Sequence, residues 1–117
     1  MKIDLADRVA LVTGATSELG RGMARTLASC GARVAIHYHQ SADKAAALQR
    51  ELPGSCVVQA DVTRQADVER MRDNVVRQLG SPDIIVNNAV IQYTWTKVLE
   101  QNPDDYRSQF ESCECFL

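Results

Sequence analysis

Two kinds of apolar segment alternate along the chain, and this alternation restricts the possible folds more than any other feature. Short runs rich in Val and Ile, as in strands buried on both faces, occupy residues 8–14, 33–38, 55–60 and 83–88. Stretches with helical spacing of apolar residues lie between them, at residues 20–30, 42–52 and 65–79. Three successive strand–helix units predict parallel strands joined by right-handed crossovers. The predicted fold is α/β, a doubly wound parallel sheet of the Rossmann type.

Composition and charge predict one soluble, cytoplasmic domain over residues 1–117. The 117 residues are 45% hydrophobic, but they contain no long apolar run and no basic leader followed by an apolar segment. The formal charge is −2, with acids and bases interspersed, so neither nucleic acid nor a membrane is an expected partner. The 4 cysteines lack CxxC spacing, which predicts reduced thiols, two of them buried, rather than a metal site.

The segment ALVTGATSELGRGMA, residues 10–24, joins the first predicted strand to the first predicted helix. Thr13 and Gly14 close the strand, and Gly20 opens the helix. In doubly wound sheets, ligands bind beyond the carboxyl ends of the strands, and a helix N-terminus favours an anion such as a pyrophosphate. The same glycines are also typical of the tight connection that any strand–helix unit needs.

Three motifs in order resemble those of the short-chain dehydrogenase/reductase family. They are TGATSELG at residues 13–20, DVT at 61–63 and NNA at 87–89, each at the end of a predicted strand. The resemblance extends from about residue 5 to residue 112. It implies an oxidoreductase that transfers hydride between a nicotinamide and a carbonyl or alcohol, similar to 3-oxoacyl carrier-protein reductases. For the four strands present, we expect the sheet order 3-2-1-4.

By the same resemblance, a pyrophosphate and the adjacent ribose would lie against Gly14, Ser17, Leu19 and Gly20. Glu18 stands in this turn where the family usually has glycine, which lets the backbone approach a phosphate closely. A glutamate here needs a backbone conformation allowed to L-residues. We therefore expect the turn to hold a dinucleotide through its N–H groups, more weakly than a glycine turn, with the Glu18 side chain directed to solvent.

The other two motifs imply contacts with the remaining parts of a dinucleotide. Asp61 would accept a hydrogen bond from the adenine amino group, and Val62 would pack on the ring. Asn88 and Ala89 would lie along the ribose nearer the nicotinamide. Two simpler interpretations stay open: Asp61 as a cap at the strand end, and Asn87 as a bridge between neighbouring strands.

The end of the second predicted strand favours NADP over NAD. Family members that use NAD generally have an acid at the position of Tyr38 to hold the ribose 2′-OH, whereas here no acid occurs before Asp43. His39 stands where NADP-preferring relatives often have arginine, so His39, Ser41 and also His37 are candidate ligands of a 2′-phosphate. His37 and His39 could also be metal ligands, but no third ligand lies nearby, and we predict no metal.

No catalytic residue is expected within this chain. The family's serine follows the fifth strand, and its YxxxK motif lies on the next helix, so residues 1–117 are predicted to be truncated before both. Tyr93 and Lys97 match the YxxxK spacing, but they directly follow the fourth strand, which is the wrong place. In an expected fourth helix at 103–116, Cys113 replaces an asparagine of the family's proton relay. Val90 replaces a glycine near the nicotinamide.

Two functional hypotheses follow from these observations. The first is the cofactor-binding half of an NADP-dependent reductase, whose longer form would act on a small carbonyl or alcohol and form a homo-oligomer. The second is a non-catalytic fragment that binds a nucleotide or a partner. A receiver domain and a P-loop enzyme are disfavoured, because the first strand lacks acids and ELGRG lacks the required lysine. Tyr93 and Trp95 are candidates for a substrate-pocket wall or for a cap on the core.

Overall fold

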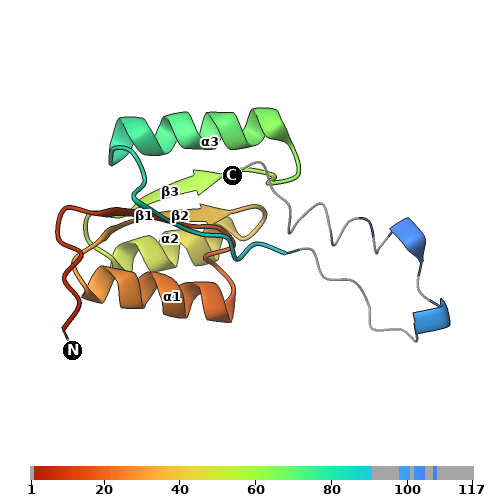
Figure 1. Ribbon diagram of the computed structural model, residues 1–117, viewed down its shortest axis with the longest axis horizontal. Helices are drawn as coiled ribbons and strands as arrows, with labels where there is room; N and C mark the ends of the chain where they lie inside the picture. The colour runs from red at the N-terminus through yellow and green to blue at the C-terminus, as the bar shows by residue number, and fades with distance from the viewer. Residues whose placement is uncertain (1, 91–97, 101, 105–106, 108–117) are drawn as a thin grey trace.

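The computed structural model describes residues 2–90, 98–100, 102–104 and 107. A four-stranded sheet lies between two helical layers (Figure 1). In chain order the elements are β1 (Val9–Val12), α1 (Glu18–Ser29), β2 (Arg33–Tyr38), α2 (Ala42–Glu51), β3 (Cys56–Gln59), α3 (Gln65–Gln78), β4 (Ile84–Val86) and the 3-10 helix η1 (Val98–Glu100). The expected helix at 103–116 falls largely outside the described residues, as do Tyr93, Trp95, Lys97 and Cys113.

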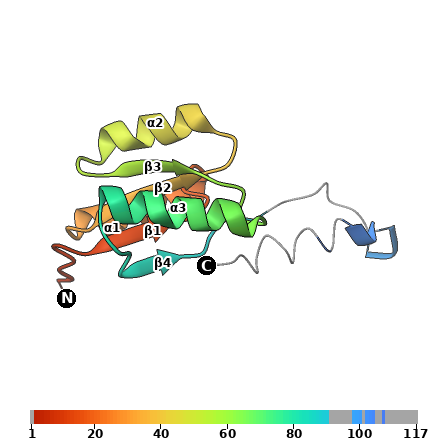
Figure 2. The same cartoon turned by 90° about the horizontal axis from the view of Figure 1, so that it is seen from above.

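The four strands are parallel and follow the order β3-β2-β1-β4, so the predicted fold class and strand order are confirmed. Figure 2 shows β1 between β2 and β4, with β4 at one edge of the sheet. Val12 of β1 is paired with Ile36 of β2 and with Val86 of β4. This register brings the carboxyl ends of the strands to one edge of the sheet, where the three sequence motifs meet.

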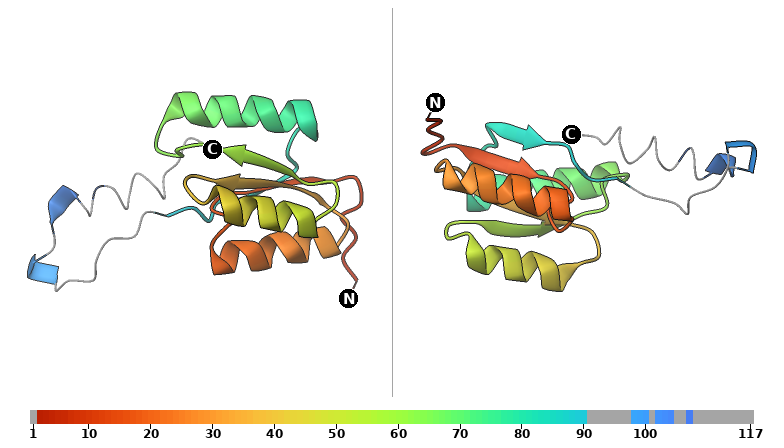
Figure 3. Two further views of the ribbon diagram at one scale, coloured as in Figure 1. Left: turned by 180° about the vertical axis from the view of Figure 1, so that it is seen from behind. Right: turned by 90° about the horizontal axis from the view of Figure 1, so that it is seen from below.

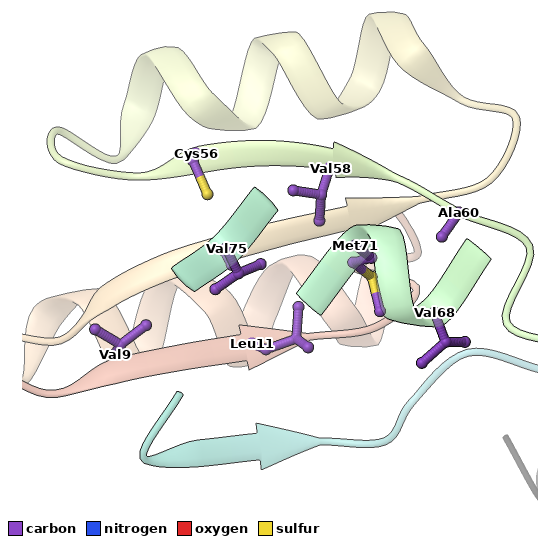
Figure 4. Packing of buried hydrophobic residues seen from close by; sticks show 9 residues of the cluster. Val9, Leu11, Cys56, Val58, Ala60, Val68, Met71 and Val75 are labelled. Carbon is purple, nitrogen blue, oxygen red and sulfur yellow. The ribbon is translucent and has the colours of Figure 1, made fainter. Parts of the chain in front are cut away.

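Helices cover both faces of the sheet, with α1 and α2 on one face and α3 on the other (Figure 3). Alternate residues of each buried strand point to opposite faces, which explains their nearly continuous apolar sequence. On the α3 face, Val68, Met71 and Val75 pack against side chains of β1 and β3 (Figure 4). Burying side chains of this size contributes about 1.5–3 kcal/mol each, so the α3 stripe fixes that helix on the sheet.

The structure shortens most of the predicted strands and moves the start of one helix. Helix α1 begins at Glu18 rather than Gly20, because the Ser17 hydroxyl accepts a hydrogen bond from the Gly20 N–H at 3.0 Å and so caps the helix. Strand β4 has 3 residues, and Ile85 within it is 50% exposed. Strand β4 therefore presents an exposed apolar side chain at the edge of the sheet.

Two further sequence expectations can be compared with the described residues. Cys56 is buried and Cys30 is partly buried, while the other cysteines lie outside the described residues. Among the helices of the described residues, none has the length and apolar character needed to cross a membrane.

Candidate functional site

The turn between β1 and α1 is closely packed, and two glycines make that packing possible. Gly14 has a φ of +62°, and a Cβ atom there would lie 2.9 Å from the Ala89 Cα. A Cβ atom on Gly20 would lie 2.3 Å from the Gly14 carbonyl oxygen. Both positions therefore exclude a side chain for steric reasons, which a sequence motif alone does not establish.

Glu18 occupies the first position of α1, at the rim of the cavity beyond the strand ends. Its φ is not positive, since Asp7 is the one described non-glycine residue with a positive φ. The backbone here is thus of the kind that an L-residue tolerates, as expected. Glu18 and its neighbour Leu19 are both exposed, Leu19 by 68%. An acid in the first turn also suits the helix dipole when no anion is bound.

Side chains at the ends of β1 and β4 hold the turn from the other side. The Asn88 amide nitrogen donates to the Gly14 carbonyl oxygen at 3.1 Å and to the Ser17 hydroxyl at 3.3 Å. The Thr13 hydroxyl, which is fully buried, accepts from the backbone N–H groups of Asn88 at 2.9 Å and Ala89 at 3.0 Å. Asn88 is therefore a structural element of the turn, and Thr13 is a contributor that sequence reasoning missed.

His37 connects the turn to the next strand. Its ring is 1% exposed, the Nδ1 atom accepts a hydrogen bond from the Gly14 N–H at 2.9 Å, and the Nε2 atom lies 2.8 Å from the Ala60 carbonyl oxygen. Burial is the main cause that lowers the pKa of this imidazole. Because both ring nitrogens have protein partners, His37 is not available as the 2′-phosphate ligand that the sequence suggested. The sequence feature that could have indicated this structural role is the position of His37 within an otherwise largely apolar strand.

A cavity of about 1050 Å³ opens at the carboxyl ends of the strands. All the predicted site residues line it except Gly20, which is buried beneath the turn, and Tyr38, which packs against the core on the α1 and α2 face. Ser41, and Lys44 in the first turn of α2, also line the cavity. Sequence reasoning did not identify Lys44 as a cation of the site. The signal was its position three residues after Ser41, which places both residues at the same end of α2.

Asp61 is anchored by its own strand end. Its Oδ1 atom accepts hydrogen bonds from the Thr63 hydroxyl at 2.6 Å and the Thr63 N–H at 3.0 Å, and its Oδ2 atom lies 4.0 Å from His39 Nε2 and 3.6 Å from Arg64 Nε. The hydrogen bond from the Thr63 side chain is the largest cause that lowers the pKa of this carboxyl. The capping role is thus present, and contact with an adenine stays a prediction.

Together, these features define a class of protein. A parallel sheet whose switch between β1 and β4 opens onto a helix N-terminus, with polar side chains gathered at the strand ends, is the arrangement of doubly wound nucleotide-binding domains. The sequence model of the short chain dehydrogenase family matches residues 8–112, and the chain belongs to this family.

Individual relatives and a solved structure are similar over most of the chain. The chain is 37% identical over 110 residues to the 3-oxoacyl-[acyl-carrier-protein] reductase FabG of Staphylococcus epidermidis, covering 82% of this chain and 45% of that protein. It is 39% identical over 105 residues to the NADPH-dependent pterin aldehyde reductase of Arabidopsis thaliana, covering 87% and 43%. A blue fluorescent protein from a metagenomic library, solved in complex with NADPH, superposes with a TM-score of 0.83 at 33% identity, covering 93% of this chain and 46% of that one. The chain therefore spans less than half the length of these relatives.

Proposed function

We propose that this chain binds an NAD(P) dinucleotide in the cavity at the strand ends, as the cofactor-binding part of a short-chain oxidoreductase. One observation carries the proposal. Gly14 and Gly20 allow the turn after β1 to pack closely against the segment after β4, so that the N-terminus of α1 borders the cavity. Thr13 and Asn88 hold the turn in this position. A helix N-terminus left accessible in this way suits a pyrophosphate. The family membership and the NADPH complex of a similar structure support the same ligand.

The cavity favours NADP over NAD. His39, Ser41 and Lys44 line it on the side of α2, and the sequence has no acid from residue 38 to residue 41 that would repel a 2′-phosphate. The ammonium group of Lys44 adds a second nitrogen donor to the imidazole of His39 on this side of the cavity. The two similar proteins whose names include NADPH agree with this preference.

When bound, a nicotinamide would supply or accept the hydride, and the residues described above would bind and orient the dinucleotide. We propose that a longer form of the protein contains the serine, tyrosine and lysine of the reaction and acts on a small carbonyl or alcohol. We also propose that this longer form is a cytoplasmic homo-oligomer. The second candidate function is a non-catalytic nucleotide-binding fragment. The intact mass of the protein from its natural source separates the two, because a mass of 12.9 kDa corresponds to the fragment.

Isothermal titration calorimetry on the 117-residue protein tests the binding proposal directly. We expect NADP⁺ to bind more tightly than NAD⁺, and adenosine 2′,5′-bisphosphate to compete with NADP⁺, since the adenine half carries the distinguishing phosphate. Absence of binding by both dinucleotides to folded protein at about pH 8, where imidazole is neutral, would contradict the proposed function.

A further inference from the structure

His37 is a buried titratable residue that joins three segments of the site. Its two hydrogen bonds reach the turn after β1, through the Gly14 N–H, and the end of β3, through the Ala60 carbonyl oxygen. Each of these partners lies 23 positions away in the sequence. The Ala60 carbonyl directly precedes Asp61, so one ring sets the spacing between the phosphate turn and the wall proposed to contact adenine.

The partners of the ring determine its protonation state. A backbone N–H always donates, so the Nδ1 atom facing Gly14 must carry a lone pair. The ring hydrogen is then on Nε2, where the Ala60 carbonyl accepts it. A second proton, on Nδ1, would point at the Gly14 N–H and remove its acceptor. The turn seen here therefore requires the neutral ring.

The charged groups nearby come from the helices and from the segments after β2 and β3. Glu18 of α1, Lys44 of α2, His39 after β2 and Asp61 after β3 line the same space, and Asp67 of α3 accepts a hydrogen bond from the Asp61 N–H. Burial lowers the pKa of His37, and the charge of His39 acts in the same direction. Below the usual pKa of histidine, His37 therefore binds fewer protons in the folded chain than in the unfolded chain. Its contribution to the free energy of unfolding is complete above about pH 6.5 and falls as the pH drops below that value.

We propose that His37 is a positioning residue of the dinucleotide site, whose neutral ring keeps the phosphate turn and the wall after β3 in register, so that acidification releases the turn and weakens dinucleotide binding. The inference rests on the proposed function. It assigns to His37 no contact with the ligand, and it predicts a pH dependence that a merely space-filling residue would not produce.

Two substitutions separate the contacts of the ring. In His37→Asn, an amide oxygen near the place of Nδ1 can still accept from Gly14 but cannot titrate, whereas His37→Gln places its amide near Nε2 and leaves the Gly14 N–H without its acceptor. At about pH 8, where the ring is neutral, we expect His37→Asn to bind NADP⁺ about threefold more weakly than the wild type, because it keeps the acceptor for Gly14 but loses the hydrogen bond to Ala60. His37→Gln should bind about tenfold more weakly, as an unsatisfied buried donor implies.

Titrations repeated down to about pH 5.5, below the usual range of histidine, then decide the inference. The affinity of the wild type should fall by up to about tenfold per pH unit more than that of His37→Asn, with circular dichroism showing that both stay folded. The 2′-phosphate of NADP⁺ also titrates near pH 6, and the difference between the two proteins removes its contribution. Equal acid weakening in both proteins would overturn the inference. The inference would also be overturned if the acid weakening of binding disappeared only in His39→Gln, the variant of the other histidine of the chain.

Nitrogen NMR of the ligand-free wild type gives a second measurement that does not depend on binding. We expect Nδ1 of His37 to be unprotonated at about pH 8, and the Gly14 amide signal to move as the ring is protonated at lower pH. A proton on Nδ1 at about pH 8 would overturn the inference even if NADP⁺ binds. Conversely, an unprotonated Nδ1 in a protein that binds no dinucleotide would contradict the proposed function and leave the turn contact intact.

Discussion

At the scale of single residues, the entrance of the cavity has charges of opposite sign on its two sides. Glu18 stands at the start of α1, where the pyrophosphate is proposed to bind, and Lys44 stands in the first turn of α2, on the side proposed for a 2′-phosphate. Both are exposed, so their effects depend on ionic strength and on the ligand's own charge. Either charge can be removed by a substitution to glutamine, which changes the size of the side chain only slightly.

Replacing Glu18 with Gln should strengthen dinucleotide binding, because a negative charge no longer competes with the pyrophosphate for the helix N-terminus. Interactions of this kind amount to about 0.3–1 kcal/mol, so the dissociation constant for NADP⁺ should fall about two- to fivefold at low salt. Calorimetry at low and high salt measures the effect, which should shrink as salt is added.

Asp43→Asn is the matched control for the Glu18 variant. It removes the same charge from the first turn of α2, and Asp43 does not line the cavity. An equal gain in affinity from both substitutions would mean that net charge, rather than the place of Glu18, governs binding.

Replacing Lys44 with Gln should weaken binding of NADP⁺ and leave NAD⁺ unaffected, since only the first ligand carries a 2′-phosphate. An exposed ion pair contributes up to about 1 kcal/mol, which corresponds to about a fivefold rise in the dissociation constant. Arg50→Gln, near the other end of α2 and outside the cavity lining, is the control and should change neither affinity. Equal losses for both dinucleotides would assign Lys44 another role.

At the scale of elements, the site depends on how closely α1 approaches the turn and β4. Two glycines separated by one residue in the first turns of α1 illustrate this dependence. A Cβ atom on Gly20 would lie 2.3 Å from a backbone oxygen and 2.9 Å from the Asn88 amide, whereas one on Gly22 would meet no atom within 4 Å. The same substitution therefore has opposite consequences at the two positions.

Gly20→Ala should destabilise the fold by about 1–3 kcal/mol, the usual cost of overpacking, and abolish tight dinucleotide binding by displacing the turn. Gly22→Ala should instead stabilise it by about 0.5–1 kcal/mol, because alanine is the better helix former. Urea denaturation of both variants measures these changes. A Gly20→Ala protein as stable as the wild type would show that α1 can move away from the turn without loss.

The same elements show what the sequence could and could not predict. Buried parallel strands have a distinctive composition, so β2 was located to the residue and the order of the sheet followed from the family motifs. The roles of His37 and Lys44 could not be read in this way, because they depend on which side chains the register of three strands brings together. The start of α1 at Glu18 depends on the hydrogen bond that caps the helix at Ser17, which the spacing of apolar residues does not reveal.

At the scale of the whole molecule, the two edges of the sheet differ in their protection. Helix α2 packs against β3 at one edge, whereas β4 at the other edge exposes an apolar side chain, and no strand of the described residues pairs with the outer side of either. Ile85 of β4 is 50% exposed. On the α1 face of the sheet, a groove of about 860 Å³ is lined by apolar side chains that include Met23, Leu27 and Val86. Exposed apolar edges of this kind favour association with another chain.

Ile85→Lys should therefore reduce concentration-dependent association of the 117-residue protein, because a charged side chain on an edge strand opposes pairing. Sedimentation velocity over a range of concentrations measures the change. Ile3→Lys is the control, since Ile3 is 57% exposed in the N-terminal segment, outside the sheet. Association reduced equally by both substitutions, or by neither, would show that β4 is not the surface involved.

The hydrogen bond from Asn88 to the Gly14 carbonyl has a consequence for synthesis on the ribosome. The two residues are separated by 74 positions, and Thr13 receives the N–H groups of Asn88 and Ala89 over a similar separation. A nascent chain exposes the turn long before it exposes the residues that hold it in place, and a domain generally folds as a unit. We therefore expect that the proposed dinucleotide cannot assist the first steps of folding. The chain should become able to bind it only when β4 and the residues after it have left the exit tunnel.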